Sequence, residues 1–209
     1  MKRQVFTIFM SLAVGATMTG RLSAAPKTFD FKDPKGVNAI TIGLDSLLEP
    51  IVGFADGISG EAAFDPADLA ASHGHIVVAT ESIRMSNPTM TKVLHSDAWL
   101  DVAKNPEVRY TIETVDAVKK TDANTWELAV TGPFTLNGIT QKESVTLTLT
   151  HLPGRLKDRN HEGSGDLLVV RATFAIDRTR YAIKPDLPPF SVARTITLGV
   201  RIVGAALDQ

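Results

Sequence analysis

The 209-residue chain has no cysteine, and this absence removes several classes of protein at once. Without thiols there is no disulfide framework, no thiolate zinc site, no iron–sulfur cluster and no cysteine nucleophile. Aromatic residues are also scarce, at 6% of the chain, and 22 Lys and Arg residues nearly balance 23 Asp and Glu residues. A nucleic-acid binder needs a basic face to displace counterions from phosphates. We therefore expect no nucleic-acid partner.

The hydrophobic content of 44% is enough for an ordinary core, which excludes intrinsic disorder for most of the chain. The length fits one large domain or two small ones. No internal repeat, low-complexity tract or linker composition interrupts the sequence after residue 25. The sequence therefore predicts a single domain over residues 26–209.

Residues 1–25 have the features of an export signal. Met1-Lys2-Arg3 is a positively charged start, residues 5–16 are mostly apolar, and Ser23-Ala24-Ala25 offers small residues for a signal peptidase just before Pro26. The apolar stretch is short for a bilayer anchor, so an uncleaved membrane helix is the weaker interpretation. We expect cleavage near Ala25 and a soluble mature chain in a bacterial periplasm, where a protein can rely on its core without disulfides.

From residue 37 onward, apolar residues mostly alternate with polar or small ones, and turn signals recur at short intervals. Asn137-Gly138 is a hairpin signal, residues 161–165 suggest a long hairpin loop, and Asn87-Pro88 opens a short amphipathic helix through Leu94. The alternation predicts eight β-strands, at residues 40–44, 58–64, 74–83, 108–112, 126–136, 145–149, 167–176 and 192–204.

Eight antiparallel strands can close into a barrel, which removes unpaired edges. Such an interior is either filled by side chains or wide enough for one small ligand. Aromatic residues are few, and the expected inward positions include the small residues Gly60, Ala62, Gly132 and Ala175. This composition favours an apolar slot, about 25 Å tall for ten-residue strands, that suits a long, thin, apolar chain. A barrel or sandwich that fills its own interior remains the alternative.

A transmembrane barrel would also follow a signal peptide. It needs an outward apolar band between two aromatic girdles and a polar interior. The few aromatic residues supply such girdles poorly, although alternation alone does not say which face points inward.

Four segments in order resemble the YceI-like family. They are Ile58-Ser59-Gly60 with Phe64-Asp65, then Ser96, Trp99-Leu100-Asp101-Val102, Lys104 and Pro106 leading into Val108-Arg109-Tyr110, then Gly132, Phe134 and Leu136 to Thr140, and finally Phe174-x-Ile176-Asp177-Arg178 with Tyr181 and Ile183. The alternating strand from Val192 to Val203 matches the family's ending. The resemblance covers nearly the whole mature chain.

This resemblance implies an all-β fold, an eight-stranded antiparallel lipocalin-like barrel with one short helix. It also implies that a hydrophobic tunnel holds an isoprenoid chain, such as a polyprenyl lipid or a quinone tail. Asp45 and Val93 stand where many members carry histidine, and residues 141–144 are about two residues longer than usual. These departures are expected to change contacts with the ligand's head group.

We predict that one face of each strand lines the tunnel, although ordinary core packing is the alternative for each residue. Trp99 and Leu100 are expected to cap one end. Arg178 is a candidate for contact with a polar head group, and a surface salt bridge is its simpler interpretation. The predicted lining residues are Ile42, Ile58, Phe64, Val78, Ile112, Leu128, Val130, Phe134, Leu147, Phe174, Ile196 and Leu198.

Enzyme and metal motifs are missing from the sequence. It contains no G-x-S-x-G, H-E-x-x-H, P-loop or G-x-G-x-x-G pattern. His73 and His75 lie two residues apart but have no third ligand nearby, which favours a solvated strand end over zinc. We expect a lipid carrier without cofactor, metal or catalytic residue. A filled β-domain acting through its surface, as a stress-response or assembly partner, is the alternative, and an enzyme of unknown type is the third hypothesis. The sequence leaves open whether the chain forms a homodimer.

Overall fold

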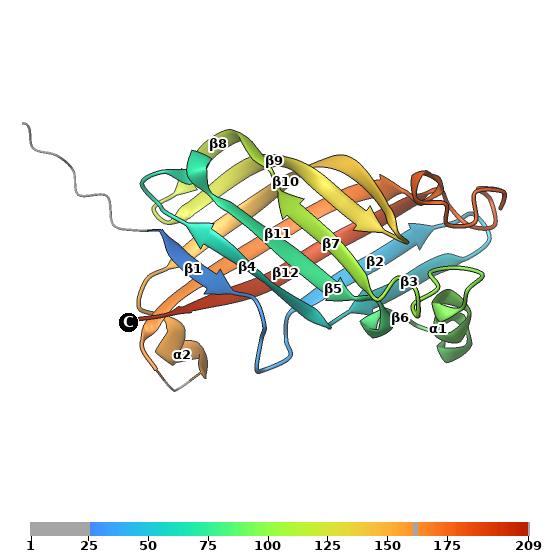
Figure 1. The fold of residues 1–209 in the computed structure, drawn as a ribbon, viewed down its shortest axis with the longest axis horizontal. Coiled ribbons are helices and arrows are strands. Elements are labelled where there is room, and N and C mark those ends of the chain that lie inside the picture. Colours follow the sequence, from blue (N-terminus) through green and yellow to red (C-terminus); the bar gives the residue numbers. More distant parts are fainter. Residues whose placement is uncertain (1–25, 161–162, 209) are drawn as a thin grey trace, which may run out of the picture.

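The computed structural model describes residues 26–160 and 163–208. The predicted signal segment lies outside the described residues. Figure 1 shows an elongated barrel of strands with short helices at its two ends. The strands are β1 (Lys27–Asp30), β2 (Ala39–Asp45), β3 (Pro50–Ala55), β4 (Ile58–Phe64), β5 (His73–Ala79), β6 (Arg84–Met85), β7 (Glu107–Ile112), β8 (Thr114–Asp122), β9 (Thr125–Leu136), β10 (Ile139–Leu152), β11 (Gly165–Asp177) and β12 (Thr195–Leu207).

These strands form one closed antiparallel barrel with eight positions around its circumference. β1 and β2 both pair with β12, at Ala205 and at residues 197–201 respectively, so together they make one interrupted position. Three further positions are each shared by two strands in the same way: β3 with β4, β5 with β6, and β7 with β8. The ring closes because β1 pairs with both β4 and β12. The predicted eight-stranded barrel is therefore confirmed.

Asn38 bridges the break between β1 and β2. Its side-chain amide donates to the carbonyls of Phe31 and Val203, at 3.0 and 3.1 Å, and accepts from the Val203 N–H at 2.8 Å. The amide thus replaces a peptide unit in the ladder along β12. Asn38 is 2% exposed, so these bonds also satisfy a buried polar group.

Each of the eight predicted strands corresponds to one barrel position, but several boundaries are wrong. The sixth strand, β10, begins at Ile139 instead of Val145 and ends at Leu152 instead of Leu149. The third strand ends at Ala79 instead of Ile83, because Thr80–Ser82 forms a 3-10 turn in which the Ser82 hydroxyl donates to the Ala79 carbonyl at 2.7 Å. The last strand begins at Thr195 instead of Val192, because residues 182–194 form a loop across one end of the barrel. We call this segment the mouth loop.

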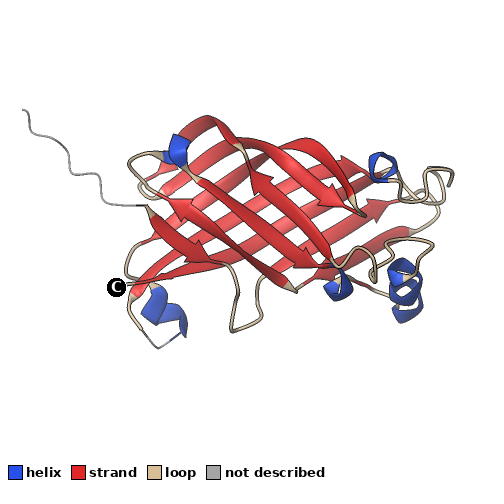
Figure 2. Ribbon diagram, in the orientation of Figure 1, coloured by secondary structure: helices blue, strands red, loops and turns tan. Residues whose placement is uncertain are grey.

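The short helix was predicted correctly. α1 (Pro88–His95) begins after Asn87, whose side chain accepts a hydrogen bond from the Thr89 N–H at 2.8 Å. This N-cap satisfies a backbone donor that has no partner inside the helix, and Pro88 fits the first turn. α2 (Leu156–Asn160) is a single short turn between β10 and β11 that the sequence pattern did not predict. Figure 2 shows both helices outside the strand wall. Among the described residues, no helix is long and apolar enough to span a bilayer.

The predicted turn at Asn137-Gly138 joins β9 and β10. Both residues have positive φ, 51° and 71°, which a two-residue hairpin turn requires. The ladder continues without a shift through residues 141–144, which pair with residues 131–134 of β9. The longer hairpin therefore preserves the alternation of inward and outward side chains.

Asp166 on β11 is held at the α2 end of the barrel by three donors. Its carboxylate lies 2.8 Å from the Lys27 ammonium and 3.0 Å from His151 Nε2, and it accepts from the Gly154 N–H at 2.8 Å. Burial alone would raise the pKa of Asp166, but the hydrogen bonds from Lys27, Gly154 and His151 outweigh it and lower this pKa to about 2.

We expect Asp166→Asn to lower the free energy of unfolding at pH 7 by about 1–2 kcal/mol. Because the folded-state pKa lies below the usual 3.8, the stabilisation is present above about pH 4 and disappears as the pH falls toward 2. Urea unfolding at a series of pH values should therefore show the wild-type and variant stabilities converging in acid. Asp158→Asn, which removes an exposed pair with Arg155, is the control and should change little. A constant difference across the pH range would contradict this assignment.

Candidate functional site

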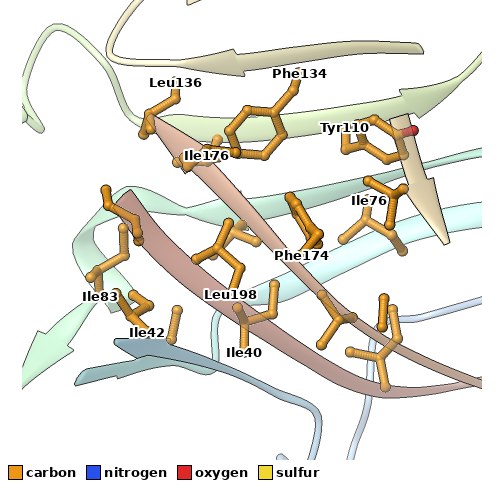
Figure 3. Close-up of a pocket in the computed structure, with 18 of the residues that line it drawn as sticks. Ile40, Ile42, Ile76, Ile83, Tyr110, Phe134, Leu136, Phe174, Ile176 and Leu198 are labelled. Atoms are coloured by element: carbon orange, nitrogen blue, oxygen red, sulfur yellow. The ribbon is translucent and has the colours of Figure 1, made fainter. Parts of the chain in front are cut away.

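The barrel encloses a cavity of about 360 Å³ whose walls are almost entirely apolar. This volume lies in the range of small-molecule pockets. Figure 3 shows side chains from β2, β5, β7, β9, β11 and β12 pointing into one shared space. The alternating apolar faces predicted from the sequence thus meet inside the barrel, and they leave an unfilled space between them.

Small inward residues help to keep this space open. Ala62 on β4 lies opposite Gly74 on β5, and both line the cavity, as does Ala172 on β11. Of the small residues predicted to face inward, Ala62 is the one in the wall. Gly132 instead allows β9 and β7 to approach, since an added Cβ would lie 1.9 Å from the Thr111 carbonyl oxygen.

Two other predictions about small residues differ from the structure. Gly60 is not part of the cavity wall. Ala175 is exposed, because the inward positions of β11 are the even-numbered residues, such as Phe174 and Ile176. The prediction for Ala175 is therefore wrong by one residue of strand alternation.

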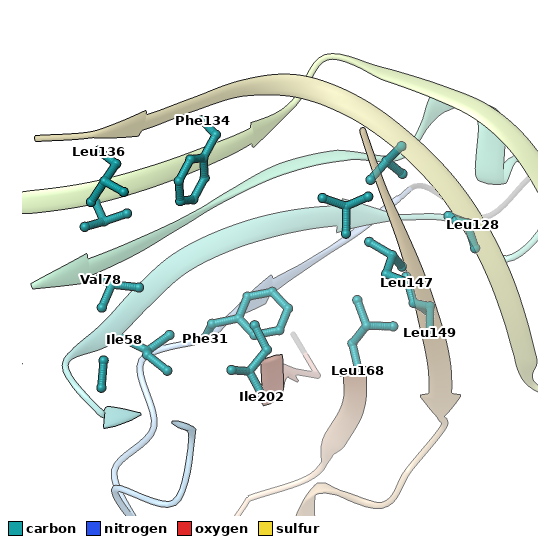
Figure 4. Close-up of a cluster of buried hydrophobic side chains, with 14 of the residues drawn as sticks. Phe31, Ile58, Val78, Leu128, Phe134, Leu136, Leu147, Leu149, Leu168 and Ile202 are labelled. Atoms are coloured by element: carbon teal, nitrogen blue, oxygen red, sulfur yellow. The ribbon is translucent and has the colours of Figure 1, made fainter. Parts of the chain in front are cut away.

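Aromatic rings close the cavity at the α2 end. Phe64 contacts the rings of Phe29, Trp126 and His151 at centroid distances of 6.1, 5.8 and 5.2 Å. All four residues are buried. Next to them, Phe31, Leu149, Leu168 and Ile202 belong to the cavity wall, and Figure 4 shows these side chains gathered within the barrel. Phe29, Phe64 and Trp126 thus plug this end, whereas Trp99, Tyr110, Phe134 and Phe174 line the cavity.

The other end of the cavity lies beneath α1, the segment containing Trp99 and Leu100, and the mouth loop. Thr89 and Val93 on α1 are exposed and also line the cavity, so the cavity reaches the molecular surface here. Trp99 and Leu100 line the same end, where the sequence analysis placed them as a cap. Asp45 ends β2 at this end of the barrel. We call this opening the mouth.

Arg178 anchors the mouth loop and is completely buried. It donates to five backbone carbonyls: Ala193 from Nε at 2.9 Å, Ile183 at 2.7 Å and Lys184 from Nη1, and Leu187 and Val192 from Nη2 at 3.1 and 2.8 Å. These bonds use all five N–H donors of the guanidinium group. Ala182 and Lys184 have positive φ, 53° and 45°, and the Arg178 bonds hold this strained stretch in place.

The predicted roles of Arg178 are therefore corrected. It forms no surface salt bridge, because it is 0% exposed and binds backbone carbonyls instead. It also keeps no free donor for a ligand head group, although it borders the cavity. Burial lowers the pKa of Arg178, and the neighbouring Asp177 partly offsets this effect. Its hydrogen bonds give Arg178 a structural role, which is to shape the mouth.

Two tyrosines near the cavity keep their protons over the physiological range. Tyr110 lines the wall, and its hydroxyl donates to the carbonyls of Val130 and Glu143, both at 3.3 Å. Burial, together with nearby negative charge, raises the pKa of Tyr110 to about 12. Burial and the hydrogen bond to Glu143 likewise raise the pKa of Tyr181. The two tyrosines therefore add no negative charge beside the cavity, whose other ionisable lining residues include Glu61, His75 and the fully bonded Arg178.

Most of the predicted lining residues lie in the cavity wall, and the rest lie in the packed core. In the wall are Ile42, Val78, Trp99, Leu100, Ile112, Phe134, Leu147, Phe174, Arg178, Ile196 and Leu198. Outside it, but buried, are Ile58, Phe64, Leu128 and Val130. Phe64 belongs to the aromatic plug, and the other three fill space that the cavity does not reach. Whether the wall residues bind a ligand remains a prediction.

Several residues of the cavity wall are not among the predicted lining residues. Ile40, Ile76 and Val200 face the cavity and lie two residues from predicted lining positions, so the period-two alternation could have identified them. Met90 and Leu94 on α1 also line it, and their spacing of four residues marks one face of a helix. Neither strand alternation nor helical spacing identifies Val192 in the mouth loop, because its position depends on the hydrogen bond from Arg178.

Comparison with known proteins agrees with this architecture. A UPF0312 protein of Shewanella baltica is 26% identical over 193 residues, which cover 91% of this chain and 93% of that protein. The crystal structure of Burkholderia cenocepacia BcnA has a TM-score of 0.64 at 15% identity, covering 79% of this chain and 95% of that one. A structure described as a polyisoprenoid binding domain from Saccharophagus degradans has a TM-score of 0.59 at 11% identity, covering 87% and 99%. The YceI-like domain model matches residues 4–204, so the chain belongs to the YceI-like family.

Proposed function

We propose that this protein binds an isoprenoid-type lipid, a polyprenyl chain or the tail of a quinone, inside its barrel and carries it without catalysing a reaction. The observation that carries this proposal is the apolar cavity, which is closed by rings at one end and open at the other. The description of the Saccharophagus degradans domain as polyisoprenoid binding supports the same class of ligand.

The arrangement of polar groups suggests how the ligand lies. The donors of Arg178 and the hydroxyl of Tyr110 are already bonded to backbone carbonyls. A polar head group placed deep in the cavity would lose its bonds to water without gaining new ones. We therefore propose that the hydrocarbon tail enters first and that the head group stays at the mouth, near Asp45 and Val93.

The energetics favour chain length as the main determinant of affinity. Each buried methylene contributes about 0.8 kcal/mol, so one added isoprene unit contributes a few kcal/mol if the cavity accommodates it. Geranylgeraniol, which is one isoprene unit longer than farnesol, should therefore bind at least about tenfold more tightly. Isothermal titration of both alcohols in detergent-free buffer measures this difference. Equal affinities, or no binding of either alcohol, would contradict the proposal.

We also propose export to the periplasm, with removal of residues 1–25. The support is the charged start, apolar stretch and small residues of that segment. N-terminal sequencing of protein from the periplasmic fraction of its host should begin at Pro26. Protein found only in the cytoplasm with Met1 or Lys2 at its start would contradict this location.

A further inference from the structure

Three of the large apolar side chains that are exposed at the mouth of the barrel lie on two neighbouring loops. Leu47 and Leu48, in the turn between β2 and β3, are 84% and 65% exposed, and Phe190 in the mouth loop is 54% exposed. The Leu48 N–H donates to the Phe190 carbonyl at 3.1 Å, and the Ala193 N–H donates to the Ser46 hydroxyl at 2.8 Å. These bonds join the two loops, so Leu47, Leu48 and Phe190 form one surface, the rim patch.

The rim patch continues the apolar wall of the cavity outward. Leu44 and Ile51, on either side of the β2–β3 turn, line the cavity, and so does Val192, two residues after Phe190. The rim residues themselves do not line it. An apolar surface therefore runs from the cavity to the tips of the two loops. Figure 1 shows both loops at the same end of the barrel, beyond the ends of the long strands.

Charges around the rim patch are of both signs. Lys184 and Arg194 lie in the mouth loop with Asp186, while Asp45 and Glu49 flank the β2–β3 turn. Such a mixture gives little attraction to an anionic surface. Contact through this face therefore depends on burial of apolar side chains, as in proteins that lie in the membrane interface.

We propose that the rim patch docks on a lipid bilayer, with Leu47, Leu48 and Phe190 inserted among the lipids. This inference rests on the proposed function. A hydrocarbon tail crosses water at high cost, and the apolar surface from the loop tips to the cavity lets it pass from the bilayer into the barrel without that step. A second copy of the chain bound to this face would instead cover the route by which ligand enters.

The test uses the triple variant L47S/L48S/F190S and vesicles of phosphatidylcholine, which carry no net charge. Wild-type protein should co-sediment with these vesicles, with little dependence on salt, and the rim variant should bind at least tenfold more weakly. V118S/L207S is the matched control, because Val118 and Leu207 are also exposed apolar residues, at 43% and 70%, but lie on β8 and at the end of β12. The control should bind vesicles like the wild type.

A second measurement separates docking from ligand binding. In vesicle-free buffer, farnesol should bind the wild type and the rim variant with equal affinity, since the rim residues lie outside the cavity wall. Vesicle binding without farnesol binding would support docking and contradict the proposed function. Docking is overturned if the wild type does not co-sediment, if the rim variant binds vesicles as well as the wild type, or if sedimentation velocity shows a wild-type dimer that the rim variant cannot form.

Discussion

Replacing Ala172 with phenylalanine should weaken the binding of farnesol or geranylgeraniol at least a hundredfold. Ala172 lines the cavity on β11, between Leu147 and Val200 on the neighbouring strands. A phenyl ring at this position would occupy the space through which a hydrocarbon chain must pass. A loss of a few buried methylene contacts is enough for this effect, since each contributes about 0.8 kcal/mol.

The same variant should fold normally. The ring enters a cavity of about 360 Å³, so it fills empty space and does not overpack a tight core. Filling cavities commonly adds about 0.5–2 kcal/mol of stability. Thermal unfolding should therefore show an unchanged or higher Tm without ligand and a reduced shift in Tm on addition of geranylgeraniol.

Ala175→Phe is the matched control, because Ala175 lies on the same strand but is exposed on the outside. It should bind both alcohols like the wild type. The cavity would not be the ligand site if A172F kept wild-type affinity, or if A175F lost affinity to the same extent.

Arg178→Met should lower the free energy of unfolding by about 3–5 kcal/mol. Methionine resembles the apolar stem of arginine but is shorter and has no donor, so five backbone carbonyls of the mouth loop lose their partner. A buried acceptor left without a partner costs about 1–3 kcal/mol. The total loss of stability is smaller than the sum of five such costs, because a loop at the mouth can move and expose some of its carbonyls to water.

Two further variants make this prediction specific. Arg178→Lys keeps the charge but offers only three donors without the planar fork, so it should restore less than half of the lost stability. Arg180→Met removes an exposed side chain that pairs with Glu143 at 2.6 Å, and it should cost less than about 1 kcal/mol. Urea unfolding measures the stabilities, and hydrogen exchange should accelerate at residues 182–194 in R178M. A free energy of unfolding for R178M within about 1 kcal/mol of the wild-type value would contradict this role.

The barrel could be predicted from the sequence because one physical rule acts along each strand. Alternating residues such as Val145, Leu147 and Leu149 must share a face, and eight such faces can be buried together only by closure around one interior. β8 was missed because its outward and inward positions are both largely exposed, so its nine residues show no apolar alternation. β1, β3 and β6 are short continuations of other barrel positions, and their pairing depends on neighbours distant in the sequence.

The site could be predicted only in part. Strand alternation identifies which side chains point inward, but it does not say how far along the barrel axis each side chain lies. Leu128 and Val130 were therefore predicted to line the cavity together with Phe134, although they lie in the packed core. The role of Arg178 depends on a loop that folds back over it, and no local pattern marks the carbonyls that it binds. Basic residues are rarely buried without an acidic partner, so a surface position was the simpler expectation for Arg178.

Native mass spectrometry of the wild-type protein, purified from its own host without detergent, tests the central claim most directly. The account predicts a species heavier than the processed chain by the mass of one isoprenoid lipid, and recovery of that lipid by extraction into organic solvent. A172F, purified in the same way, should have the mass of the chain alone. A wild-type protein that carries no additional mass and yields no lipid would contradict the account.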